Sequence, residues 1–275
     1  GGNLVAEGAL QIGVVTAVVE YSMLTLAYLM IAAMVLVIIP KSFASLRRIE
    51  EILQAEIEIE EETIKTVAEP TFDQTNAAAF EHVTFKYTEI SDPVLEDIDF
   101  TIPKGKTTAI VGGTGSGKSS LAKLLLRLSD PTIGKVTLGG IPLTQMTQEQ
   151  IRSHISYVPQ KAFLFSGTIL SNLQMGNEYA STEELSKAIK IAQLEELVDT
   201  LPDGLDSFVA QGGSNYSGGQ KQRICIARAL IKPAEIYVFD DSFSALDYKT
   251  DAALRAALHK HMSEKTLVIV AQRHV

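Results

Sequence analysis

The sequence predicts an α/β domain that follows a long apolar helix. Three short apolar runs have the length and composition of buried strands in a parallel sheet: 107–111, 236–239 and 267–271. The segment 170–230 has mostly helical patterning, and Ser181 offers a helix N-cap there, so we expect a separate helical lobe. The first forty residues, by contrast, are almost all apolar. The predicted fold class is therefore α/β, with an apolar helix ahead of the domain.

Two further strands are expected upstream of the first apolar run, at residues 80–87 and 94–102. Their alternating apolar pattern is typical of half-buried strands, and Pro93 lies in the turn between them. Because so short a connection joins antiparallel neighbours, these strands predict an antiparallel β subdomain.

The apolar N-terminal segment has the length of a membrane span. Glu20 is the only charged residue in 8–40, and the uncharged stretch 21–39 would be about 28 Å long as a helix, close to the hydrocarbon thickness of a bilayer. No Lys or Arg precedes Lys41, whereas basic residues follow it closely, which orients the C-terminal end toward the cytoplasm. A signal peptide, disfavoured by the lack of basic residues at its front, and a buried core helix are the alternatives. Glu20 is either a substrate contact or a residue at the outer interface of the membrane.

The chain divides into three parts. Residues 1–53 are expected to be the last membrane helix with a cytosolic extension, because the helical pattern continues past Pro40. Residues 54–78 are an acidic linker, and 79–275 form the α/β domain. The chain starts without an initiator Met and stops directly after an apolar strand-like run, so we expect a fragment whose domain is truncated at its C-terminus.

Composition excludes some classes of partner and site. The net charge of −9 argues against a nucleic-acid partner, because phosphate backbones select for clustered Lys and Arg. Cys225 is the single cysteine, so no internal disulfide can form, and a reducing compartment fits.

A phosphate-binding loop is the strongest local signal. Residues 112–119 match the pattern GxxxxGK[ST], directly after the run 107–111 and before a predicted helix at 120–128. The glycines let backbone N–H groups close around a β-phosphate at the positive end of the helix. Lys118 is expected to reach the β- and γ-phosphates, and the Ser119 hydroxyl to bind Mg²⁺. The candidate nucleotide-binding residues of this segment are Gly112, Gly113, Thr114, Gly115, Ser116, Gly117, Lys118, Ser119 and Ser120.

Two adjacent carboxylates, Asp240 and Asp241, follow the apolar run 236–239. The C-terminal ends of strands are where open α/β sheets bind their ligands. Asp240 suits a Mg²⁺ role, as the Walker B acid of phosphate-loop ATPases.

Residues 216–223, Tyr-Ser-Gly-Gly-Gln-Lys-Gln-Arg, lie between these two motifs and resemble the signature sequence of ATP-binding cassette proteins. The chain as a whole resembles the exporter branch of that family, in which the final transmembrane helix is fused to the cassette. The resemblance implies a RecA-like phosphate-loop domain with an antiparallel β subdomain and a helical lobe, and ATP and Mg²⁺ as cofactors. It also implies that two cassettes dimerise head to tail, so that each ATP lies between one phosphate loop and the signature of the partner. The signature residues are Ser217, Gly218, Gly219 and Gln220.

Three other residues acquire expected roles through the same resemblance. Tyr87 is similar to the aromatic residue that stacks on adenine. Gln160 is similar to the glutamine that links Mg²⁺ and the attacking water to the membrane domain, and is thus a candidate metal ligand. Asp247 ends the segment 244–247, which resembles the family's D-loop.

Two positions depart from the family pattern. Active members carry a glutamate after the Walker B aspartate, whereas this chain has Asp241, whose carboxylate is withdrawn by about 1 Å or more. At the switch position, where the family has histidine, this chain has Gln272, which can donate a hydrogen bond to a phosphate but cannot become a cation. Together with Gln160, these are the candidate catalytic residues, and the two departures predict a degenerate catalytic centre.

The function implied by the resemblance is that of the ATPase subunit of an exporter. ATP binding and hydrolysis would drive export of a small molecule, lipid or peptide across the cell membrane, which the full-length protein spans several times with its cassette in the cytoplasm. Because the signature is intact while the chain's own site is degenerate, we expect a heterodimer with a second half-transporter. The alternatives are a regulatory subunit whose ATP binding gates a channel or transporter, and a soluble cassette ATPase acting on nucleic acid or ribosomes.

Overall fold

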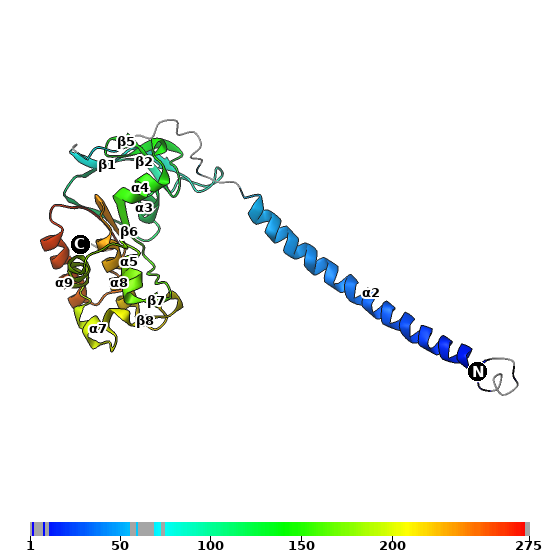
Figure 1. Ribbon diagram of the computed structural model, residues 1–275. Helices are drawn as coiled ribbons and strands as arrows, with labels where there is room; N and C mark the ends of the chain where they lie inside the picture. Colours follow the sequence, from blue (N-terminus) through cyan, green and yellow to red (C-terminus); the bar gives the residue numbers. More distant parts are fainter. Residues whose placement is uncertain are drawn as a thin grey trace. The chain divides into compact units, whose positions relative to one another are not determined.

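The computed structural model describes residues 2, 8, 11–55, 59, 69–72 and 75–272 of the 275-residue chain (Figure 1). Its contacts divide the chain into two units, Gly1–Glu58 and Ile59–Val275, each described here by itself. Most of the acidic stretch of the expected linker, and the residues after Gln272, lie outside the described residues.

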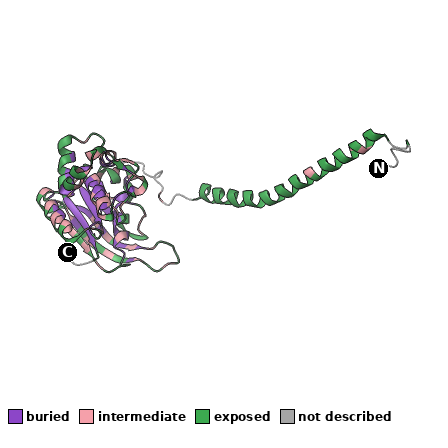
Figure 2. Cartoon of the chain, turned by 90° about the horizontal axis from the view of Figure 1, so that it is seen from below, coloured by how far each residue is buried: buried purple, intermediate pink, exposed green. Residues whose placement is uncertain are grey.

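The first unit contains helix α2, Ile12–Leu53, of 42 residues. The helix continues through Pro40 to Leu53, as the sequence pattern predicts. None of its described residues is buried, which Figure 2 shows as a continuous exposed helix with two short half-buried patches. Hydroxyl side chains such as Ser22 and Thr25 donate to backbone carbonyls one turn earlier, at 2.7 Å each, so their polar atoms are satisfied within the helix. By length and composition α2 can cross a membrane, a property it shares with signal sequences and some core helices.

The second unit is an α/β domain with a four-stranded parallel sheet. Its order is β3-β10-β9-β6. The strands are β3 Thr107–Val111, β10 Thr266–Ala271, β9 Ile236–Asp240 and β6 Ile155–Val158. Three of the four were predicted from their apolar runs, and β6 was missed because half of its residues are polar.

An antiparallel sheet with the order β2-β1-β4-β5 accompanies it. The strands are β1 Asn76–Phe85, β2 Leu95–Pro103, β4 Ile133–Leu138 and β5 Ile141–Pro142. The predicted antiparallel pair is confirmed as β1 with β2. Strand β1 begins at Asn76, three residues before the expected domain boundary, and ends at Phe85, so Tyr87 lies just beyond it. The sequence prediction did not include β4 and β5.

Helices and short turns complete the domain. They are α3 Lys118–Leu125, η1 Leu143–Gln145, α4 Gln148–His154, α5 Ile169–Gln174, α6 Thr182–Ile191, α7 Glu195–Thr200, η2 Gly204–Asp206, η3 Gln211–Gly213, α8 Gly218–Ile231 and α9 Tyr248–His261, with a small hairpin of β7 Gly167–Thr168 and β8 Phe208–Val209. The predicted helical lobe corresponds to α5–α8, and Ser181 caps α6 by accepting a hydrogen bond from the Glu184 N–H. The predicted helix 120–128 instead begins at Lys118 and ends at Leu125, because Arg127 adopts a left-handed backbone.

Side chains alternate across the parallel strands and thereby build two cores. Val238 and Val268 point into a core that they share with α3 and the antiparallel sheet. Phe239 and Ile269 point the other way, into a core shared with α8 and α9. Figure 2 shows the buried residues concentrated on these strands, which makes the sheet a rigid base for the loops at its C-terminal edge.

Candidate nucleotide-binding site

The loop at 112–119 connects strand β3 to helix α3, as the motif requires. Gly117, at the helix N-cap, has a positive φ of 85°. A Cβ at this position would lie 2.7 Å from the Leu95 side chain and 2.9 Å from the Val94 carbonyl oxygen, so only glycine fits. The first residues of α3 line the cavity beside the loop, so the positive end of this helix is available to an anion there.

The Lys118 side chain is buried and folds back into this loop. Its ammonium group donates to the carbonyl oxygens of Gly112, at 2.8 Å, and Gly113, at 2.6 Å. A third, longer contact joins the ammonium group to the Ser116 hydroxyl at 3.4 Å, so all three of its N–H donors are directed into the loop. The arrangement concentrates positive charge inside the loop.

Two predicted magnesium ligands meet at the carboxyl end of β9. The Ser119 hydroxyl donates to Asp240 Oδ1 at 3.0 Å, although 121 positions separate the two residues. Neighbouring oxygens around an octahedral Mg²⁺ lie about 3 Å apart when each is about 2.1 Å from the metal. The hydroxyl and carboxylate oxygens therefore have the chemistry and spacing that Mg²⁺ requires.

Tyr157 completes the surroundings of Asp240. Its hydroxyl donates to Asp240 Oδ2 at 3.1 Å, so both oxygens of this buried carboxylate are held. Burial, followed by the negative charge of Asp240, raises the pKa of Tyr157 well above its ordinary value, so the phenol stays a hydrogen-bond donor. Sequence reasoning missed Tyr157. It could have been found only by recognising 155–158 as a strand, since β6 lies next to β9 in the sheet and thereby brings Tyr157 to Asp240.

The three candidate catalytic residues meet at one carboxylate oxygen. Gln160 donates to Asp241 Oδ2 at 3.1 Å, and Gln272 donates to the same atom at 2.9 Å. These residues follow the neighbouring strands β6, β9 and β10, whose C-terminal ends share one edge of the sheet. Asp241 has a left-handed backbone with φ of 47°, and its N–H donates to the Val270 carbonyl oxygen at 2.9 Å. The strained backbone turns its side chain toward the two amides.

A cavity of about 240 Å³ opens between the loop and this edge. Its lining includes most of the predicted loop residues together with Gln160, Asp240, Asp241 and Gln272. Val94 and Val270 add apolar walls. Tyr87 stands beside it, because the Tyr87 hydroxyl is 2.9 Å from the hydroxyl of Ser120, a lining residue.

The signature residues lie elsewhere in the described part of the domain, and none of them lines this cavity. Ser217 caps helix α8 and forms a reciprocal capping box with Gln220. Gly218 is exposed in the first turn, where an added Cβ would meet no atom within 4 Å. An exposed helix N-terminus with two small residues suits approach by an anion bound to another chain.

Asp247 also lies outside the cavity lining. It caps helix α9, and hydrogen bonds from the Thr250 hydroxyl and N–H lower the pKa of its carboxyl group. Within a single chain, its role as the N-cap of α9 is sufficient to explain an aspartate at this position.

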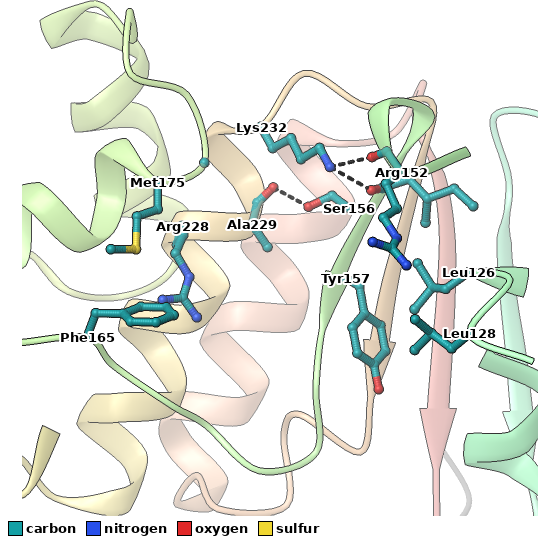
Figure 3. A pocket seen from close by; sticks show the side chains of 12 residues that line it. Leu126, Leu128, Arg152, Ser156, Tyr157, Phe165, Met175, Arg228, Ala229 and Lys232 are labelled. Carbon is teal, nitrogen blue, oxygen red and sulfur yellow. Dashed lines mark hydrogen bonds between the residues drawn. The ribbon is translucent and has the colours of Figure 1, made fainter. Parts of the chain in front are cut away.

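A second cavity, of about 360 Å³, lies on the other side of Tyr157 (Figure 3). Phe165 and Arg228 lie together on one side of it, with the guanidinium carbon 5.8 Å from the ring centre. Lys232 reaches the carbonyl oxygens of Arg152 and Ile155. Tyr157 thus lines this cavity with its ring while its hydroxyl holds Asp240 in the first one.

Known proteins match this arrangement. The family model for the ABC transporter matches residues 95–244, more than half of the chain. An ABC transporter ATP-binding protein of Mycobacterium tuberculosis is 40% identical over 276 residues, covering 99% of this chain and 47% of that protein. A probable multidrug resistance ABC transporter ATP-binding/permease protein of Bacillus subtilis is 40% identical over 230 residues, covering 84% of this chain and 39% of the relative.

A solved structure is similar as well. A bacterial Atm1-family ABC exporter with ATP bound has a TM-score of 0.76 and 31% identity, covering 85% of this chain and 40% of that chain. The chain spans less than half the length of these two curated relatives. The phosphate loop, the paired carboxylates and the signature sequence all fall within the matched span, and the chain belongs to the ABC transporter family as its ATP-binding domain.

Proposed function

We propose that this chain is the ATP-driven end of a membrane exporter, with α2 as the last membrane helix and the α/β domain in the cytoplasm. The relatives that support this include a probable multidrug resistance transporter and an Atm1-family exporter. Helix α2 adds support through its length, its apolar composition and the basic residues that follow its uncharged stretch. The full-length protein would cross the cell membrane several times, and its cargo would be a small molecule, lipid or peptide.

ATP with Mg²⁺ is the proposed ligand of the 240 Å³ cavity. Lys118 holds positive charge where the β- and γ-phosphates would lie, and Ser119 with Asp240 would bind the metal ion, which neutralises developing phosphate charge when bound. Tyr87, half-exposed beside Ser120, would stack on the base. Gln160, which lines the cavity and donates to Asp241, would join the metal region to the membrane part of the protein.

The chain's own catalytic centre is proposed to be slow. Asp241 is one methylene shorter than the glutamate that the family pattern has, so its carboxylate stands farther from a water at the phosphate. Two amides already donate to its Oδ2, so a water at the phosphate would compete with them for that oxygen. Gln272 offers an uncharged amide where histidine would offer a cation.

A heterodimer follows from this proposal. The intact signature lies away from the chain's own cavity, so it is free to complete the site of a second cassette placed head to tail. Two copies of this chain would contain two slow centres. A partner half-transporter with glutamate and histidine at the two deviant positions would contribute one fast centre, completed by Ser217, Gly218 and Gly219 of this chain.

The observation that carries the proposal is the meeting of Lys118, Ser119 and Asp240 at one cavity. Inside-out vesicles that contain the full-length complex should take up substrate or reporter dye only with ATP, and electrical recording of the same complex should show no ATP-gated current. An ATP-gated current without uptake would replace export with channel gating.

A further inference from the structure

Tyr87 is held by three neighbours, although it lies outside any strand or helix. Its hydroxyl is 2.9 Å from the Ser120 hydroxyl, and its ring packs edge-on with Phe85 at a centroid distance of 4.8 Å and an interplanar angle of 74°. The third neighbour is Lys123, whose ammonium nitrogen lies 3.4 Å from the Tyr87 hydroxyl and 5.4 Å from the ring centre. Half of the Tyr87 surface remains exposed.

Lys123 is placed by helix α3. It lies one turn beyond Ser120, so the two side chains share one face of the helix and reach the same tyrosine. Lys123 is exposed and is absent from the residues that line the phosphate cavity, whereas Lys118 is buried within it. The two lysines of this helix therefore serve different parts of the site.

We propose that Lys123 is a positioning residue for Tyr87, which fixes the aromatic ring as a platform for the purine base. This inference rests on the proposed binding of ATP. The cation attracts the ring and donates to its hydroxyl, so it removes the freedom that a half-exposed tyrosine in a loop would otherwise have. Preorganisation of the platform raises affinity for the base and leaves the phosphate contacts unchanged.

Binding of MgATP and of magnesium tripolyphosphate to the full-length protein separates the two parts of the ligand. Lys123→Met should weaken MgATP binding roughly two- to fivefold, the range of an exposed cation–π contact, and leave tripolyphosphate binding unchanged. Lys123→Arg should retain wild-type MgATP binding, since guanidinium also stacks on aromatic rings. Lys187→Met, which removes an exposed lysine from helix α6, is the charge-matched control.

A double-mutant cycle completes the test. In a Tyr87→Ala background, Lys123→Met should have no further effect on MgATP binding, because the ring through which it acts is gone. Equal weakening of both ligands would mean that Lys123 contacts phosphate, and an unchanged MgATP affinity would mean that it does nothing for the platform; either result overturns the inference alone. If the wild-type protein binds neither ligand, the proposed function fails and the inference falls with it.

Discussion

The side-chain amide of Gln272 donates a hydrogen bond to Asp241 Oδ2 at 2.9 Å. The two residues follow neighbouring strands, β10 and β9, and they are the two positions at which we expect a departure from the family's catalytic pattern. The departures are therefore in contact, and each forms part of the environment of the other. Substitutions at the two positions should couple rather than add.

Restoring both residues should raise hydrolysis at this chain's own phosphate loop. Asp241→Glu with Gln272→His is expected to accelerate turnover there by about tenfold to a hundredfold, because the carboxylate advances by one methylene and an imidazole replaces an amide. The rate is measured as decay of nucleotide trapped at this loop in the co-purified complex. Because the two positions couple, the rate increases of the two single variants should together be smaller than the increase of the double variant. Equal decay rates before and after the double change would contradict a slow native centre.

Loss of the loop cation should strongly weaken nucleotide binding. Lys118→Ala removes the positive charge that Gly112 and Gly113 hold in the loop, and we expect ATP affinity to fall at least about tenfold. Photolabelling of membranes with azido-ATP measures this, with Lys106→Ala as an exposed-lysine control. Labelling of the Lys118→Ala protein at wild-type strength would contradict the assigned role.

The two active centres of the proposed heterodimer should respond unequally to substitution. Gly218→Asp places a carboxylate at the exposed start of α8 without a clash inside this chain, and it should nearly abolish steady-state ATPase of the complex by repelling the nucleotide of the partner. Asp241→Asn alters the slow centre and should cost much less. Severe and equal losses from both variants would instead indicate two equivalent centres, as in a homodimer.

Tyr157→Phe should weaken magnesium-dependent binding. The phenol holds one oxygen of Asp240, and loss of such a supporting contact commonly costs about tenfold or more in metal affinity. A Mg²⁺ titration of nucleotide labelling should show a higher midpoint, with Tyr237→Phe, at a buried tyrosine that bonds backbone groups away from Asp240, as the matched control. An unchanged midpoint would show that Asp240 does not need this donor.

The same tyrosine gives a pH dependence of stability. Its pKa is raised in the folded chain, so its contribution to the free energy of unfolding is complete below the ordinary tyrosine pKa of about 10 and is lost as pH rises beyond that value. Denaturant unfolding of wild type and Tyr157→Phe should therefore differ by a constant amount between pH 6 and 9, roughly, and converge in stronger alkali. A difference that changes near neutral pH would point to another titrating group.

Local patterns in the sequence determined the phosphate loop, the paired carboxylates, the signature and helix α2. Each depends on neighbours within one element: glycine spacing at 112–119, an apolar run before Asp240, or forty residues of nearly unbroken apolar composition. These motifs can be recognised in a single sequence because the residues that supply their chemistry and their backbone geometry are neighbours along the chain. Strand β6 was missed because Ser156, which is buried, and Tyr157, which is half-buried, find their hydrogen-bond partners only in the tertiary structure.

Tertiary structure decided which of these residues touch. Gln160 and Gln272 reach Asp241 from 81 and 31 positions away, and no pattern along the chain measures such distances. They meet because the parallel strands are ordered β10-β9-β6, which brings three C-terminal ends to one edge of the sheet. Lys123 contacts Tyr87 because α3 shares a core with the antiparallel sheet, whose strand β1 ends at Phe85, close to the tyrosine. The sequence thus determined which residues were candidates for the site, and the spatial order of the strands determined which of them are in contact.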